Sequence, residues 1–122
     1  MITIDRQVRS LAYLASTRAY TSDIRKGKHC AIVFDKRYNI VASFINSGRV
    51  HAEQGAVAML EKHQKNEEGD YTLLVVRAMR STCQLNMSKP CEECDTTIRN
   101  CSSIKRVIFS QAHGKYGFIS IN

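Results

Sequence analysis

The hydrophobic and polar positions of the chain follow a helical period in some segments and a strand-like pattern in others. Apolar residues recur at helical spacing near the N-terminus, which predicts an amphipathic helix over residues 4–19. Two apolar, β-rich runs follow, "CAIVFD" and "YNIVASFI", and the turn-like "KRYN" between them predicts a hairpin. A second helix is predicted over residues 51–64, because the polar stretch "KNEEGD" ends the apolar pattern there.

The second half of the chain continues the alternation of strands and helices. "YTLLVVRAM" predicts a third strand, "CEECDTTIRN" a short helix, and "KRVIFS" and "YGFISI" a fourth and a fifth strand. Several of these strands are apolar on both faces, which indicates helices on both sides of the sheet. We therefore expect an α/β fold, a three-layer α/β/α sandwich with a mixed sheet of about five strands. The connection "SQAHGK" is too short for a crossover helix and predicts that the last two strands form an antiparallel hairpin.

Length and composition indicate one domain. The chain has 122 residues, of which 43% are hydrophobic, and no linker-like stretch interrupts it, so residues 1–122 are expected to form a single core. No apolar run is long enough to span a membrane, and the N-terminal residues lack the apolar segment of a secretory signal. We expect a cytoplasmic protein. The net charge of +7 favours anionic partners such as nucleotides or nucleic acid, although the Lys and Arg residues are scattered along the whole chain.

The stretch "RVHAEQGAVAML" contains a carboxylate where a buried helix is predicted. Glu53 lies among small apolar residues in this stretch. Burial of a carboxylate costs several kcal/mol unless a partner compensates it. The position of Glu53 therefore indicates a chemical role and not a stabilising one.

The stretch "MSKPCEEC" contains a candidate metal site. Cys91 and Cys94 have C-x-x-C spacing, with Pro90 just ahead of them, so that two thiolates from one helical turn can bind one metal ion. The chain has five cysteines, an odd number, and we expect no secretory signal, which favours reduced thiols over a disulfide framework. From this spacing alone a structural zinc site, redox chemistry and a chance pairing all remain open.

His51 is the candidate third ligand because it also opens a predicted helix directly after a strand and a loop. Two helix N-termini at the same edge of one sheet can converge on a single ion. Three protein ligands leave the fourth tetrahedral position of zinc open for water, which is the catalytic arrangement. Glu53, two residues beyond His51, would then lie beside the metal and could move a proton from water to a leaving group.

These two motifs together resemble the signature of a known family. His51-Ala52-Glu53 and the later Pro90-Cys91-Glu92-Glu93-Cys94 are similar to the H-x-E…P-C-x-x-C pattern of the zinc-dependent cytidine deaminase superfamily. The resemblance extends from about Lys28 to Ser110 and includes the element order of that fold. It implies one Zn²⁺ per subunit on His51, Cys91 and Cys94, with Glu53 as the general acid/base and not a ligand.

The resemblance also implies contacts with the substrate. Asn46 would contact the sugar or the phosphate, the backbone of Ala52 would bond the pyrimidine edge, and a carbonyl near Ser88 would accept from the departing amine. The alternative for Asn46 is a strand-ending turn, and the alternative for Ser88 is an ordinary loop. Arg49 is the best-placed cation for a substrate phosphate, and its alternative is an exposed loop arginine.

The remaining histidines, cysteines and tyrosines are expected to have ordinary structural roles. His29 and His63 are expected on the surface or in packing, and Cys30 as a small hydrophobic residue. Cys83 and Cys101 lack a regular metal spacing. His113 falls in a turn that could border the pocket. The tyrosines at strand ends, expected at the edge of the core, are Tyr38, Tyr71 and Tyr116.

The sequence fits no branch of the superfamily cleanly. The first ligand is His, whereas free-cytidine deaminases usually have Cys there, and the His form is typical of deoxycytidylate, cytosine, guanine and nucleic-acid deaminases. Only "SGRV" separates Asn46 from His51, which is shorter than the insertion common in deoxycytidylate deaminases. The antiparallel final hairpin also differs from the parallel arrangement of many His-type members. These departures indicate a divergent, stand-alone form.

Three functional hypotheses follow. The leading one is zinc-dependent hydrolytic deamination of a cytosine nucleoside or nucleotide (cytidine, deoxycytidine or dCMP type) to the uracil form, with release of ammonia. The second is deamination of cytosine or adenine in single-stranded RNA or DNA, which the positive charge favours but for which no aromatic cluster is evident. The third is a catalytically silent, zinc-stabilised binding module, against which the intact Glu53 argues. We expect a homo-oligomer, a dimer or a tetramer, that does not bind membranes.

Overall fold

The structure is a computed structural model that describes residues 6–20, 28–46, 50–64, 69–78, 85–112 and 114–121. Its elements closely follow the predicted ones. Their bounds are α1 Arg6–Tyr20, β1 Lys28–Phe34, β2 Ile40–Ile45, α2 Ala52–Gln64, β3 Tyr71–Ala78, β4 Leu85–Asn86, α3 Glu92–Arg99, β5 Ile104–Ala112 and β6 Lys115–Ser120. The two-residue β4 was not predicted, because it is too short to show a pattern and exists through its pairing with the end of β3.

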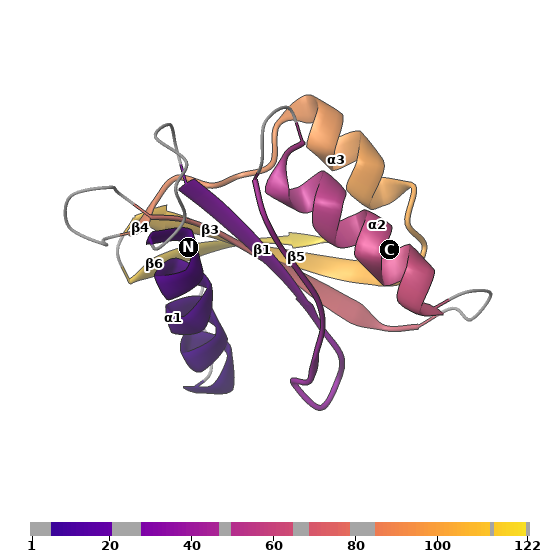
Figure 1. Cartoon of the computed structure of the whole chain (residues 1–122), viewed down its shortest axis with the longest axis horizontal. Coiled ribbons are helices and arrows are strands. Elements are labelled where there is room, and N and C mark those ends of the chain that lie inside the picture. Colours follow the sequence, from indigo (N-terminus) through magenta and orange to yellow (C-terminus); the bar gives the residue numbers. More distant parts are fainter. Residues whose placement is uncertain are drawn as a thin grey trace.

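One mixed sheet forms the middle layer, with the strand order β2-β1-β3-β5-β6 and β4 paired to β3 outside this path (Figure 1). β1 is antiparallel to both β2 and β3, so β2 runs in the same direction as β3. β5 is parallel to β3, and β6 returns antiparallel to β5. The predicted mixed sheet and the antiparallel final hairpin are therefore confirmed.

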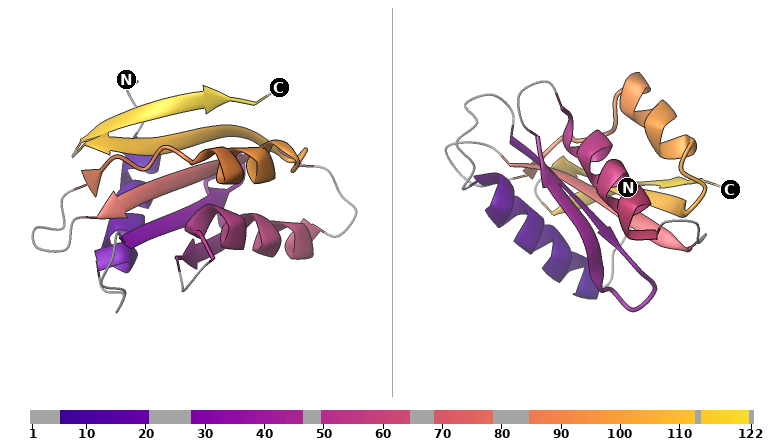
Figure 2. Two further views of the ribbon diagram at one scale, coloured as in Figure 1. Left: turned by 90° about the horizontal axis from the view of Figure 1, so that it is seen from above. Right: turned by 45° about the vertical axis from the view of Figure 1, so that its right-hand side comes forward.

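Helices cover the two faces of the sheet, as the apolar strands predicted. α1 lies on one side, and α2 and α3 lie together on the other (Figure 2). The side chains of β1 alternate between the two cores: Cys30 and Ile32 pack on the α1 side, and Ala31 and Val33 pack on the side of α2 and α3. The three-layer α/β/α sandwich is confirmed.

The topology brings the starts of α2 and α3 together. α2 connects β2 to β3 across β1, and α3 connects β3, by way of β4, to β5. Because β2 and β3 run in the same direction, both helices begin at the same edge of the sheet, and they pack against each other on one face. The two predicted chemical motifs open these two helices, so the fold places them side by side.

Most residues expected to have ordinary roles do have them. Cys30 is fully buried in the core on the α1 side, Cys101 is buried in the other core, and His63 is exposed. The three tyrosines pack at core edges: Tyr38 stacks on Phe34 with 5.8 Å between ring centroids, and Tyr71 and Tyr116 contact one core each. Cys83 and His113 lie outside the described residues. Among the described residues, no helix is long and apolar enough to cross a membrane.

Candidate active site

His51 occupies the N-cap position of α2. The backbone N–H of Gly55 donates to the carbonyl of His51 at 3.1 Å, which is the first hydrogen bond of the helix. The N–H of His51 donates in turn to the side-chain oxygen of Gln54 at 3.3 Å, as in one half of a capping box. Capping here uses the backbone of His51 and the side chain of Gln54, so the imidazole of His51 is left to face the neighbouring helix.

Cys91 occupies the corresponding position at the start of α3. Its carbonyl accepts from the N–H of Asp95 at 2.8 Å, and its thiol makes no capping hydrogen bond. Cys94 lies in the first turn of the helix and is fully buried, whereas Cys91 is exposed. The thiol of Cys94 therefore lies in the protein interior, and the thiol of Cys91 lies at the surface.

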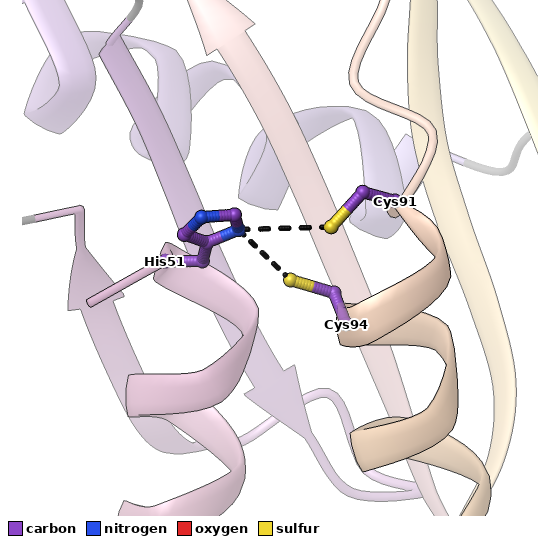
Figure 3. A group of neighbouring side chains, drawn as sticks. All are labelled: His51, Cys91 and Cys94. Atoms are coloured by element: carbon purple, nitrogen blue, oxygen red, sulfur yellow. Dashed lines mark hydrogen bonds between the residues drawn. The ribbon is translucent and has the colours of Figure 1, made fainter. Parts of the chain in front are cut away.

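The three predicted ligands lie together (Figure 3). The Nδ1 atom of His51 is 3.1 Å from the Sγ atom of Cys94 and 3.7 Å from the Sγ atom of Cys91, and all three candidate ligand atoms lie within 4.8 Å of one another. A tetrahedral zinc ion with ordinary bond lengths holds such ligand atoms about 3.5–3.8 Å apart. The group could therefore hold a zinc ion with small adjustments of the side chains, and the same imidazole nitrogen faces both thiols.

Glu53 is buried next to this group. Its side chain lies in the first turn of α2 and is 6% exposed, and among the described residues it is the only buried Asp, Glu, Lys, Arg or His. The pKa of the Cys94 thiol is raised well above its ordinary value, first by burial and then by the negative charge of Glu53. Two thiols and a carboxylate in one place favour a bound cation, because a divalent ion stabilises the thiolates that burial and Glu53 disfavour. The donor set thus fits zinc by charge as well as by distance.

The predicted substrate contacts lie at the same edge of the sheet, with one exception. Asn46 follows β2, where its side-chain oxygen accepts from the N–H of His29 at 3.0 Å. Ala52 is fully buried at the first position of α2, and Ser88 is buried just before α3. Arg49 lies outside the described residues. The proximity of Asn46, Ala52 and Ser88 to the ligands is consistent with substrate contacts, which stay predictions.

Two residues that support the site were not predicted. Gln54 had a recognisable signal, because it stands three residues after the N-cap, where Glu or Gln completes a capping box. Gly55 had none. A Cβ atom at Gly55 would lie 2.2 Å from Cδ2 of Phe44, so the ring of this β2 residue packs directly on the first turn of α2. Only glycine allows this close approach next to His51 and Glu53.

Comparison with known families agrees with this geometry. The family described as "Cytidine and deoxycytidylate deaminase zinc-binding region" matches residues 2–111. The chain belongs to this deaminase family. The resemblance inferred from the two motifs is therefore confirmed over most of the chain.

Solved structures support the same fold for this deaminase-family chain. A cytidine deaminase from Burkholderia pseudomallei superposes with a TM-score of 0.65 over 97% of this chain and 94% of that chain. The two sequences are 13% identical, so this likeness establishes the fold alone. A comparison with curated protein sequences finds no match.

Proposed function

We propose that the chain is a zinc-dependent hydrolase that deaminates the cytosine base of a nucleoside or nucleotide to uracil and releases ammonia. The observation that carries the proposal is the burial of Glu53 beside the three candidate ligands His51, Cys91 and Cys94. A purely structural zinc site does not require a carboxylate there. The same carboxylate is what hydrolysis at a C–N bond needs for moving protons.

The roles of the residues follow from this arrangement. His51, Cys91 and Cys94 would hold zinc, which, when bound, makes hydroxide available at neutral pH. As the oxygen of water bonds to C4 of cytosine, Glu53 takes up one proton and delivers it to the ring nitrogen N3. Glu53 then carries the second proton of that water to the exocyclic nitrogen, the C4–N bond breaks, and ammonia leaves with the ring in the uracil form.

The predicted substrate contacts have a consistent place in this scheme. The first N–H groups of a helix lack intrahelical acceptors, so the N–H of Ala52 is suited to bond the pyrimidine edge. A carbonyl near Ser88 would accept from the amine as it leaves, and Asn46 would contact the sugar or the phosphate. Arg49 would bind the phosphate if the substrate is a nucleotide.

A substrate panel tests the proposal. Purified protein is first analysed for metal, with one zinc per subunit expected and loss of zinc expected in a Cys91→Ala/Cys94→Ala double variant. Ammonia release is then measured with free bases, nucleosides, nucleotides and short single-stranded oligonucleotides, with Glu53→Gln as the matched inactive control. Release from nucleosides or nucleotides supports the proposal, whereas release from oligonucleotides alone favours the nucleic-acid alternative.

Two results would contradict the proposal. A zinc content near zero, or full zinc occupancy in the double-cysteine variant, would refute the metal site. A zinc-loaded protein that releases no ammonia from any member of the panel would favour the silent binding module. The homo-oligomeric state and the cytoplasmic location stay predictions, and light scattering on the purified protein tests the first of them.

A further inference from the structure

Two buried serines face each other where the central strands of the sheet separate. Ser88, in the segment before α3, is 3% exposed, and Ser110, in β5, is fully buried. Their Oγ atoms are 2.8 Å apart. Neither is among the candidate metal ligands, and an otherwise apolar core gives no reason for a hydroxyl pair there unless the hydroxyls bind something.

The strand pairing explains what the serines bind. The register of β3 with β5 ends at the pair Val75–Phe109, and beyond it β3 pairs with β4 instead. At this point two backbone groups of β3 bond to serine hydroxyls. The Ser88 hydroxyl donates to the Val75 carbonyl at 2.8 Å, and the N–H of Arg77 donates to Oγ of Ser110 at 3.2 Å. The two hydroxyls therefore bind backbone groups of β3 where its register with β5 ends.

Further hydrogen bonds join Ser88 directly to Ser110. The Ser88 Oγ atom accepts from the N–H of Ser110 at 2.9 Å, and the Ser88 hydroxyl also lies within hydrogen-bond distance of the Ser110 carbonyl, at 3.2 Å. The N–H of Ser88 donates to the carbonyl of Ser110 at 2.8 Å. Ser88 is thus fixed to β5 through backbone and side chain alike, and to β3 through its hydroxyl.

Ser88, which these hydrogen bonds hold in place, lies three residues before Cys91, the exposed candidate ligand. Cys91 precedes the first turn of α3 and depends on the preceding segment for its position, whereas Cys94 is held inside the helix and the core. Between Ser88 and Cys91 stands the buried Pro90, whose ring restricts its φ angle and stiffens the connection. A shift of Ser88 is therefore transmitted to Cys91 more than to Cys94.

We propose that Ser110, acting through Ser88, is a positioning residue that holds Cys91 in place for metal binding. This inference rests on the proposed zinc site. It gives a role in that site to Ser110, which lies outside both sequence motifs. Loss of the Ser110 hydroxyl removes one bond to Ser88 and leaves the N–H of Arg77 without its acceptor. The segment before Cys91 then opens more often, and the ion is released more readily.

Zinc release measures this effect without reference to catalysis. Zinc-loaded wild type, Ser110→Ala and Ser88→Ala are mixed with an excess of a chromogenic chelator, and the rate of zinc transfer is followed. Both variants should lose zinc on the order of tenfold faster than wild type. With Co²⁺ in place of zinc, both should show a weaker thiolate-to-cobalt absorption band, because Cys91 is bound for a smaller share of the time.

Ser103→Ala is the matched control. Ser103 is 4% exposed and lies just before the start of β5, far along the strand from Ser110. Its hydroxyl oxygen accepts from the N–H of Gly69 at 3.1 Å, so that this variant also removes a buried acceptor of a backbone N–H. It should lower the melting temperature about as much as Ser110→Ala but leave zinc release within about twofold of wild type.

The zinc-release rates of these variants decide whether Ser110 has the proposed role. Equal zinc release from Ser103→Ala and Ser110→Ala, or an unchanged rate in the serine variants, overturns the inference and leaves the proposed function standing. Wild-type protein that binds no zinc overturns both. If Ser110→Ala does not fold, Ser88→Ala carries the same test, because it removes the same link from the other side.

Discussion

Replacement of Gly55 by alanine should destabilise the protein, although alanine is the better helix former. Gly55 lies in the first turn of α2, and a Cβ atom there would lie 2.2, 2.3 and 2.5 Å from three carbon atoms of the Phe44 ring. Carbon atoms in ordinary contact are at least about 3.5 Å apart. The ring and the helix would have to separate by about 1 Å, at a place where Phe44 lies against the core.

Two opposing contributions determine how much Gly55→Ala changes the free energy of unfolding. Overpacking of this kind costs about 1–3 kcal/mol, and the change from glycine to alanine in a helix returns about 0.8–1.0 kcal/mol. Because all three distances fall about 1 Å or more below ordinary contact, we take the upper part of the overpacking range, about 2–3 kcal/mol, and expect a net loss of about 1–2 kcal/mol in the free energy of unfolding. For a chain of this size, that loss lowers the melting temperature by about 3–10 °C.

A double-variant cycle with Phe44→Ala separates the two terms. Removal of the ring removes all three of the nearest contacts of the new Cβ atom, so Gly55→Ala should stabilise the Phe44→Ala protein by up to about 1 kcal/mol. The assay is urea unfolding of the wild type, both single variants and the double variant, followed by circular dichroism. If Gly55→Ala stabilises the protein while Phe44 is present, the close contact between the ring and the helix does not exist as described.

Three further predictions concern single side chains. Glu53→Gln should keep the fold and the zinc content but lower kcat by about 10²–10⁴-fold, because the amide cannot accept a proton. Near-normal turnover of this variant in a steady-state assay would show that Glu53 does not move protons in the reaction. Arg49→Ala should lower kcat/KM for a nucleotide by about 10- to 150-fold and leave the matching nucleoside unchanged, and equal losses on both would show that Arg49 shapes its loop instead of binding phosphate. Burial raises the pKa of Tyr116 above its ordinary value of 10.0, so its contribution to stability is intact below pH 10 and is lost as the pH rises through the folded-state pKa. The urea midpoint should therefore fall less between pH 8 and pH 11 in Tyr116→Phe than in the wild type, and identical falls would contradict this account.

Much of the fold could be predicted because its signals are local. Strands such as β3, with five consecutive buried residues, show their double-sided burial directly as a continuous apolar run. The short connection before β6 limits that strand to an antiparallel return. β4 could not be predicted, because two residues carry no period and their pairing depends on where β3 ends.

In the candidate site, too, some features could be predicted from the sequence and others could not. The grouping of His51, Cys91 and Cys94 could be predicted because the two short motifs that contain them resemble a family signature. The contact of Phe44 with Gly55 and the pair of Ser88 with Ser110 could not be predicted, because each joins separate elements and leaves no periodic trace along the chain. Such long-range contacts depend on the relative placement of strands and helices, which only the folded structure shows.

The separation of the candidate ligands along the chain has a consequence for folding order. In an unfolded chain, Cys91 and Cys94 can capture an ion as a pair, but His51 lies 40 residues before the first of them. His51 reaches the two thiols only after β1 lies between β2 and β3 and both crossover helices have docked on the same face. If these three residues bind an ion, full coordination would therefore follow sheet assembly and would not nucleate it. A molecule with misplaced strands would hold its ion through two thiols and lose it to competing chelators, so tight retention of the ion would mark the chains that have completed the fold.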